Sequence, residues 1–226
     1  MYGFIIMSEI TPGRVHAGQA LYSKFFLNFY DIIALTWNLR FAWRCPAHHM
    51  IHLYDDHVSG NHLDIGVGSG YFLDRCTFPV ENPRLALMDL NPNCLKAAGK
   101  KLERYNPEKY LGNILEPTNN DGDGFDSVGL INIFHCLPGS MKTKAIVFDN
   151  VKHVMNPGAV VFGSTILGKG VEQNILARYL NWFNNKKGYM NNSEDDPETL
   201  AQELARFFSK SEVKVIGTVA LFSARK

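Results

Sequence analysis

Apolar and polar residues are grouped along this chain in blocks that predict strands and helices in turn. Short, nearly continuous apolar runs, typical of buried strands, are followed by segments whose apolar residues recur every three or four positions, as on one face of a helix. The predicted strands cover residues 62–66, 84–90, 109–115, 125–134 and 159–167. Because strands and helices alternate, we expect an α/β fold with a mostly parallel sheet and helices on both faces.

The two ends of the chain depart from this alternation. Between Leu21 and Trp37 the apolar residues recur every three or four positions, which predicts an amphipathic helix. We therefore divide the single predicted domain into a helical N-terminal cap, residues 1–57, and a core, residues 58–226. The last residues alternate in polarity on both sides of Gly217–Thr218, which predicts an antiparallel terminal hairpin at the edge of the sheet.

Local signals indicate where the helices begin. Asn91 followed by Pro92 is typical of a helix N-cap with proline at the first helical position. Ser140 is expected to cap a helix that ends at Met155, and a further helix is expected to run from the glycine-rich stretch through Arg75.

Composition narrows the class of protein. The 226 residues have an ordinary apolar fraction of 46% and a formal net charge of +1, without a long basic cluster, so we expect no nucleic-acid partner. No apolar run approaches the roughly 20 residues that span a bilayer, so we expect no membrane partner. The start of the chain lacks the features of a secretory signal, and the four cysteines are scattered. These features predict a cytoplasmic protein with free thiols.

The stretch HLDIGVGSGYF places Gly66, Gly68 and Gly70 directly behind a predicted strand. It does not match the dinucleotide fingerprint, which requires glycine where Tyr71 stands, and the phosphate-loop sequence is absent as well. The carboxylate of Asp64 would repel a pyrophosphate and favour a cationic group such as an ammonium or a sulfonium. A tight strand–helix turn, with Asp64 as a helix cap, is the structural alternative.

A second acid, Asp89, ends the next predicted strand. In open α/β sheets an acid at this place binds the ribose hydroxyls of a nucleoside, although a solvated strand end is also compatible with the sequence. A nucleoside that carries a positively charged amino-acid tail is S-adenosylmethionine.

Five segments, in this order, resemble the motifs of the class I S-adenosylmethionine-dependent methyltransferases. They are LDIGVGSG, LALMDLNPNCL, NILEP, and FDSVGLINIFHCLPG together with VMNPGAVVFGSTILG. More narrowly, RFAWRCP and HCLPG are similar to a subgroup of small methyltransferase-like proteins found beside natural-product pathways. The resemblance implies a Rossmann-like fold with a seven-stranded sheet, S-adenosylmethionine as cofactor with S-adenosylhomocysteine as product, and a small, fairly apolar acceptor in secondary metabolism. An oxygen or nitrogen acceptor atom is favoured.

The resemblance also implies a cofactor site with contributions from every motif. Asp64 and the glycines would hold the methionine moiety, Asp89 the ribose, and Asn113 with Ile114 the adenine; many relatives have aspartate where Asn113 stands, but an amide oxygen also accepts from the adenine amino group. The full set of expected cofactor-binding residues is Tyr30, Arg44, Asp64, Gly66, Gly68, Gly70, Asp89, Leu90, Asn113, Ile114 and Asn132. In this set Tyr30 and Arg44 would lie near the methionine carboxylate.

His135 follows the fourth predicted strand closely, so it is the candidate catalytic base. Its imidazole titrates near neutral pH and could take a proton from an oxygen or nitrogen nucleophile. The alternative is a packed or merely positioning histidine, because in-line methyl transfer gains most from alignment of the two reactants.

Two metal hypotheses are rejected on the sequence. His48 and His52 are four residues apart but lack a third ligand, and Asp149–Asn150 falls inside a helix on the wrong side of the predicted sheet. We predict no metal. The polar segment 184–196 is expected to form either a lid over the substrate or a surface loop.

Three functions are alternatives to methyl transfer onto a small molecule. The same fold could bind S-adenosylmethionine without methyl transfer, in a cyclase or a regulatory module, and the sequence does not separate this from catalysis. A nucleic-acid or protein methyltransferase is disfavoured by the missing basic surface, and a nicotinamide dehydrogenase is disfavoured by Tyr71 and Asp64. The oligomeric state and the identity of the acceptor stay open.

Overall fold

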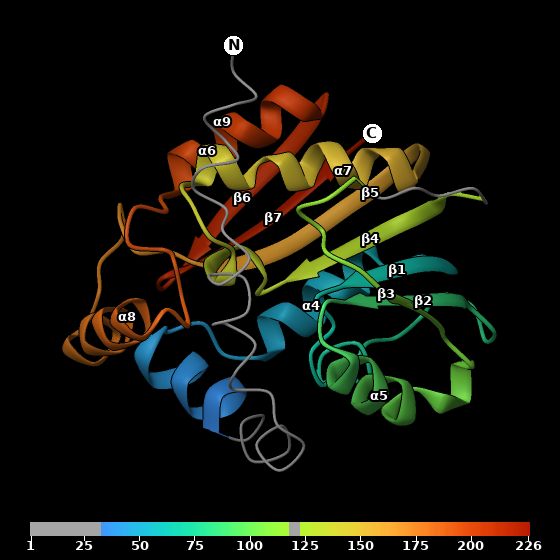
Figure 1. Cartoon of the computed structure of the whole chain (residues 1–226), viewed down its shortest axis with the longest axis horizontal. Coiled ribbons are helices and arrows are strands. Elements are labelled where there is room, and N and C mark those ends of the chain that lie inside the picture. Colours follow the sequence, from blue (N-terminus) through green and yellow to red (C-terminus); the bar gives the residue numbers. More distant parts are fainter. Residues whose placement is uncertain (1–32, 118–122) are drawn as a thin grey trace.

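The protein, in the computed structural model, is built around one seven-stranded sheet (Figure 1). The structure describes residues 33–117 and 123–226, so Tyr30 and most of the amphipathic helix predicted from Leu21 lie outside the described residues. The strand order is β3-β2-β1-β4-β5-β7-β6. The strands are β1 (Asn61–Ile65), β2 (Arg84–Asp89), β3 (Glu108–Leu111), β4 (Phe125–Ile131), β5 (Met155–Ile166), β6 (Lys210–Ile216) and β7 (Val219–Arg225).

The sheet is mostly parallel, as the sequence predicts. Strands β1 to β5 pair in parallel, whereas β7 pairs antiparallel with both β5 and β6. The turn between β6 and β7 falls at Gly217–Thr218, and Gly217 has φ +59°, a conformation that glycine adopts without strain. The predicted terminal hairpin is therefore confirmed, and with it the Rossmann-like fold class.

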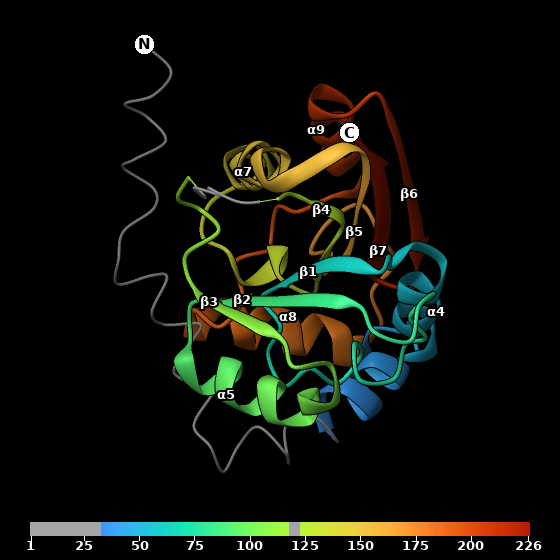
Figure 2. The same ribbon diagram turned by 90° about the vertical axis from the view of Figure 1, so that its right-hand side faces the viewer.

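Helices cover both faces of the sheet (Figure 2). Along β2, Leu85 and Leu87 pack with α4 and α5, while Ala86 and Met88 belong to the core beneath α7 and α9. This alternation follows from the two-residue repeat of a strand. The helical elements are η1 (Ile33–Ala42), α4 (His48–His57), α5 (Pro92–Lys101), η2 (Glu103–Tyr105), η3 (Phe134–Cys136), α6 (Met141–Lys144), α7 (Ile146–Val154), α8 (Ile175–Lys187) and α9 (Pro197–Phe207).

The prediction of a helix after the glycine-rich stretch is wrong. Residues 71–76 form turns, in which the Asp74 amide donates to the Gly70 carbonyl at 3.0 Å and the Cys76 amide to the Phe72 carbonyl at 3.1 Å. A longer helix cannot follow, because Pro79 and Pro83 stand in the next few residues and proline removes a helical hydrogen bond.

The helix predicted from Ser140 to Met155 is interrupted. It consists of α6 and α7, which are separated at Ala145, and the Ser140 side chain makes no capping hydrogen bond. The break lies directly after Lys144, whose buried side chain is bound by a segment more than forty residues further along the chain. By contrast, the cap at Asn91 is confirmed, since its side chain accepts from the Asn93 amide at 2.9 Å.

The helices α8 and α9 lie in a region for which the sequence indicated only a polar segment. Residues 184–196 comprise the end of α8 and its connection to α9, and this connection is tied to the rest of the protein. Asn192 donates to the Ile166 carbonyl at 2.9 Å and contacts Asn185. Within residues 33–117 and 123–226, no helix has the length and apolar character needed to cross a membrane.

Candidate active site

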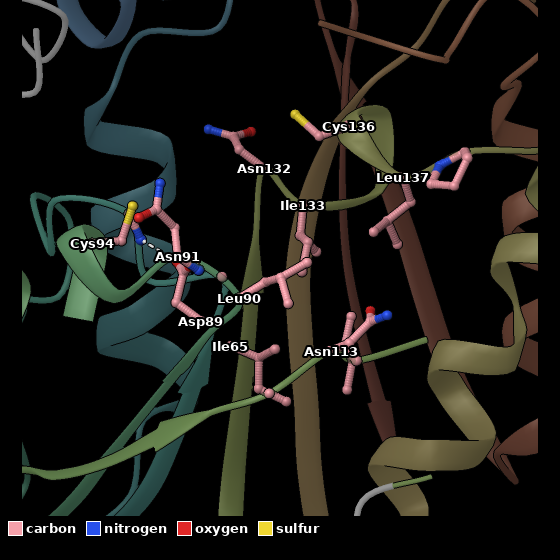
Figure 3. A pocket seen from close by; sticks show the side chains of 15 residues that line it. Ile65, Asp89, Leu90, Asn91, Cys94, Asn113, Asn132, Ile133, Cys136 and Leu137 are labelled. Carbon is pink, nitrogen blue, oxygen red and sulfur yellow. Dashed lines mark hydrogen bonds between the residues drawn. The ribbon is translucent and has the colours of Figure 1, made fainter. Parts of the chain in front are cut away.

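A cavity of about 140 Å³ opens at the carboxyl ends of β1, β2 and β4 (Figure 3). This is the place where open parallel sheets bind ligands, because the loops that follow neighbouring strands diverge there. The cavity is lined by Ile65, Gly66, Gly68, Asp89, Leu90, Asn91, Cys94, Gly112, Asn113, Ile114, Asn132, Ile133, Cys136, Leu137 and Pro138. The loops after four strands thus contribute to one site.

The glycine loop forms one wall of this cavity. Gly66, Gly68 and Gly70 have φ values of +69°, +55° and +70°, which L-residues rarely adopt. A Cβ atom on Gly66 would lie 2.9 Å from the side chain of Ile133, whereas a Cβ on Gly68 would meet nothing within 4 Å. Gly68 therefore faces open space that a ligand can fill, whereas Gly66 lies close against Ile133. Gly70 packs against Ala98 of α5 and does not line the cavity.

Asp89 is held firmly at the end of β2. One carboxylate oxygen accepts from the Gly68 amide at 3.1 Å, and the other accepts from the Asn91 amide at 2.8 Å. Burial raises the pKa of this carboxyl, against the opposing effect of the amide donors. Each carboxylate oxygen accepts more than one hydrogen bond, so Asp89 can bind the glycine loop and a vicinal diol together.

Asn113 and Ile114 line the cavity beside Leu90. The Asn113 side chain is part of its own turn, because its Oδ1 accepts from the Leu115 amide at 3.1 Å and its Nδ2 donates to Glu116 Oε1 at 3.1 Å. Ile114 is buried, and its carbonyl accepts from the Asn150 side chain at 2.7 Å. The turn that would face a nucleobase is thus anchored to α7.

Asp64 lies beneath the loop and not in the cavity lining. The residue is 2% exposed, and its carboxylate accepts a hydrogen bond from the Tyr54 hydroxyl of α4. His62 Nε2 lies 3.5 Å from the same carboxylate oxygen. The structure therefore does not bring Asp64 into direct reach of the cavity. Its negative charge nevertheless lies directly below the loop, two residues before Gly66.

Asn132 lines the cavity from the end of β4, with φ +57°. Its amide donates to the Ser164 carbonyl at 2.9 Å, and the Ser164 hydroxyl donates to Asn132 Oδ1 at 2.9 Å. Asparagine tolerates this left-handed backbone better than most residues. The contacts with β5 therefore hold both its backbone and its side chain.

The structure does not place His135 in the cavity lining. His135 lies in η3, is 5% exposed, and its Nδ1 accepts from the Ile166 amide at 3.3 Å. Burial, and to a lesser degree the charge of Lys144, lowers the pKa of His135 to about 3. The imidazole is therefore neutral at physiological pH and a weak base. This geometry argues against the predicted proton transfer, which stays an untested prediction.

The two residues expected near a methionine carboxylate are not brought to the cavity either. Arg44 is exposed, has φ +52°, and does not belong to the lining. It adjoins the turn between β6 and β7, where the Thr218 amide donates to the Trp43 carbonyl at 2.9 Å. Tyr30 lies outside the described part of the chain.

Several lining residues were not predicted as site residues from the sequence. Cys136, Leu137 and Pro138 belong to the stretch HCLPG, and Asn91 and Cys94 to the stretch NPNC. Both stretches begin within four residues of the end of a strand that reaches the cavity, and this position was the available signal. The four cysteines of the chain are unpaired, as expected.

For metals, the described residues contain no group of three or more His, Cys, Asp or Glu side chains suited to hold an ion. His48 and His52 lie on α4 with their ring centres 5.9 Å apart.

Comparison with known proteins identifies the family of this chain. Residues 63–161 match the family model described as a methyltransferase domain. Demethylluteothin O-methyltransferase from Streptomyces thioluteus is 39% identical over 216 residues, which cover 96% of this chain and 94% of the relative. The physcion biosynthesis cluster O-methyltransferase from Aspergillus chevalieri is 38% identical, with 97% of this chain and 99% of the relative covered.

Solved structures share the fold. The complex of DhpI with S-adenosylhomocysteine superimposes with a TM-score of 0.60 at 16% identity and covers 100% of this chain and 98% of that chain. N-methyltransferase NodS from Bradyrhizobium japonicum WM9, in complex with S-adenosyl-L-homocysteine, has a TM-score of 0.56 at 17% identity, with 79% and 84% covered. The fold is Rossmann-like, and the cavity lies where such folds bind their ligands. The chain belongs to the S-adenosylmethionine-dependent methyltransferases.

Proposed function

We propose that this enzyme transfers the methyl group of S-adenosylmethionine to an oxygen or nitrogen atom of a small, fairly apolar molecule of secondary metabolism. The observation that carries the proposal is Asp89, fixed by the Gly68 and Asn91 amides at the rim of a cavity that Gly68 leaves open. The relatives from Streptomyces thioluteus and Aspergillus chevalieri bear the names of O-methyltransferases, which supports an oxygen acceptor.

The residues of the cavity fit the cofactor part by part. Asp89 would accept from the ribose hydroxyls, while Asn113, Ile114 and Leu90 would surround the adenine. Gly66 and Gly68 would let the backbone approach the methionine moiety, with the buried charge of Asp64 beneath them. When bound, the cofactor supplies a methyl group on a positively charged sulfur.

In this proposal, catalysis rests on alignment of the acceptor atom with the methyl carbon and on exclusion of water. The cavity wall formed by Ile133 and Leu137 is apolar and supports both functions. The reaction requires no metal ion. Four unpaired thiols are compatible with a reducing, cytoplasmic setting.

Calorimetry with S-adenosylhomocysteine and with NADH tests the proposed cofactor. We expect binding of S-adenosylhomocysteine that is lost or strongly weakened in Asp89→Ala, and no binding of NADH. Release of S-adenosylhomocysteine from S-adenosylmethionine in the presence of an acceptor then distinguishes methyl transfer from binding alone. A protein that binds neither S-adenosylmethionine nor its demethylated product would contradict the proposal.

A further inference from the structure

Asn132 and Ser164 form a closed hydrogen-bonded ring at the end of β4. The Asn132 amide donates to the Ser164 carbonyl at 2.9 Å and also to Ser164 Oγ at 3.2 Å, and the same Oγ donates its hydrogen to Asn132 Oδ1 at 2.9 Å. Ser164 is fully buried on β5, directly opposite Ile131 in the parallel register. The ring therefore joins two neighbouring strands at the rim of the cavity.

This ring determines which end of the Asn132 carboxamide faces the ligand. The backbone amide can only donate, so Ser164 Oγ accepts from it and is left with its own hydrogen to donate. The partner of that hydrogen must be the carboxamide oxygen. With the carboxamide reversed, its Nδ2 would face Ser164 Oγ, and the buried hydroxyl hydrogen would lose its acceptor. Oδ1 therefore keeps its hydrogen bond with Ser164, and Nδ2 is the end of the carboxamide that is available to a ligand in the cavity.

The position of Asn132 in the cavity indicates that its Nδ2 lies near the reacting atoms. In Figure 3, Asn132 and Cys136 lie at one end of the cavity, away from Asn113 and from Leu90, which the proposed function places around the adenine. With the ribose at Asp89, the remaining end holds the sulfur and the incoming acceptor. The Nδ2 hydrogens carry partial positive charge, so they would repel a sulfonium or an ammonium and attract an oxygen lone pair.

We propose that Asn132, oriented by Ser164, donates its Nδ2–H to the acceptor oxygen, and that this oxygen enters as the anion of an acidic hydroxyl, a phenol or an enol. The inference rests on the proposed function and specifies its substrate class. A fixed donor stabilises an oxyanion more than a neutral hydroxyl, and an apolar wall strengthens that preference. The nearby imidazole of His135 is buried, with its Nδ1 accepting from Ile166, so it is not arranged to take the proton.

The transfer step balances in this form. The hydroxyl proton passes to solvent before transfer, a lone pair of the resulting phenolate or enolate oxygen forms the new bond to the methyl carbon, and the electron pair of the carbon–sulfur bond stays on sulfur. The products are a neutral aryl or enol ether and a neutral thioether. Asn132 holds the oxygen during the displacement and loses no proton itself.

The first test uses 4-nitrophenol, whose anion absorbs visible light, with the protein saturated with S-adenosylhomocysteine. We expect the apparent pKa of bound 4-nitrophenol to fall below its value in water. The fall should be smaller in Ser164→Ala, whose carboxamide can rotate, and should turn into a rise in Asn132→Asp, which faces the ligand with a carboxylate. Thr165→Val removes the adjacent buried hydroxyl of β5, which makes no hydrogen bond, and should leave the shift unchanged. An unchanged or raised pKa in the wild-type protein would overturn the inference.

The second test compares two isomeric acceptors, the phenol 5,6,7,8-tetrahydro-2-naphthol and the aliphatic alcohol 1,2,3,4-tetrahydro-2-naphthol. We expect transfer to the phenol only, with kcat/KM reduced about 100-fold in Asn132→Ala and about tenfold in Ser164→Ala. Asn132→Asp should be the least active variant, whereas an increase in its rate would show that the site needs a base and would overturn the inference.

Calorimetry distinguishes a failure of this inference from a failure of the proposed function. Binding of S-adenosylhomocysteine should be equal in the wild-type, Asn132→Ala and Ser164→Ala proteins. A tenfold loss in the variants would place Asn132 on the methionine carboxylate and overturn the inference while the proposed function stands. No binding by the wild-type protein would instead defeat the proposed function.

Discussion

The ammonium of Lys144 lies 2.6 Å from the carboxylate of Asp195, and both side chains are buried. The same ammonium donates to the Asn191 carbonyl at 2.6 Å, and the Asn191 amide donates to the His135 carbonyl at 2.7 Å. One cation at the end of α6 thus joins the connection between α8 and α9 to η3, which borders the cavity. Removal of a single partner would leave an uncompensated buried charge.

We therefore expect Lys144→Met alone to destabilise the protein by about 3–5 kcal/mol, whereas Lys144→Met combined with Asp195→Leu should be close to the wild-type protein. Urea unfolding measures the free energy for each variant. The solvent-exposed pair of Lys169 and Glu194 provides the control, and Lys169→Met should change stability little. Equal losses of unfolding free energy in the single and the double variant would contradict the explanation by an uncompensated buried charge.

His135 should make stability depend on pH. Its pKa is lowered from 6.5 to about 3 in the folded protein, so between these values the unfolded chain binds a proton that the folded protein does not. Stability should therefore fall as the pH drops below 6.5, with a contribution of about 1.4 kcal/mol per pH unit from this residue. Above pH 6.5 it contributes nothing.

The measurement compares urea unfolding of the wild-type protein with that of His135→Gln, which cannot titrate, between pH 7 and pH 5. The difference in free energy between the two proteins should change with pH in the direction just given. The pH profile of kcat should keep its shape in the variant. Loss of one limb of that profile in His135→Gln would show that His135 acts as the catalytic base.

Asp89 should determine cofactor affinity. Replacement of its carboxylate by an amide in Asp89→Asn weakens the hydrogen bonds to the ribose, and we expect a loss of about 1.5–3 kcal/mol, or roughly 10- to 150-fold in Kd for S-adenosylhomocysteine. Titration calorimetry measures this loss. Asp74→Asn, which loosens an exposed ion pair with Arg104, is the matched control and should bind normally.

Asp64 should distinguish the two forms of the cofactor by charge. Its carboxylate lies below the glycine loop, bound to Tyr54, so it can act on the ligand only through its field. In Asp64→Asn the affinity for S-adenosylmethionine, with its positive sulfur, should fall more than the affinity for neutral S-adenosylhomocysteine. Tyr54→Phe keeps the negative charge but removes the donor.

We expect Tyr54→Phe to cost about 1.5–3 kcal/mol of stability and to preserve the ratio of the two dissociation constants. Calorimetry with both ligands gives that ratio, and urea unfolding gives the stability. Equal losses of affinity for the two ligands in Asp64→Asn would show that Asp64 does not act on the cofactor through its charge.

Gly66 should not tolerate a side chain. Gly66→Ala combines a positive φ with a Cβ placed 2.9 Å from Ile133, whereas Gly158→Ala has a positive φ and open space around it. Both should lose about 1–2 kcal/mol from backbone strain, and Gly66→Ala should lose more because Ile133 has to move. Since Ile133 lines the cavity, only Gly66→Ala should also weaken binding of S-adenosylhomocysteine.

The sequence by itself determined the features that depend on local chain patterns. The apolar runs and their spacing predicted the parallel strands and the terminal hairpin, since a buried strand and a tight turn each need particular residues within a few positions. The glycines after β1 and the acid at the end of β2 could also be predicted, because parallel strands bring their carboxyl ends to one edge. Asp89, Gly66 and Gly68 were located in this way.

Only the tertiary structure decided where the remaining side chains point. Asp64 is bound by a tyrosine from α4, and His135 is buried against β5, although Asp64 lies at the end of β1 and His135 follows β4, and both strands end at the cavity. Ser164 stands 32 positions from Asn132, and Asp195 stands 51 positions from Lys144. Partners at such separations are chosen by the packing of whole strands and helices, which no local pattern of polarity records.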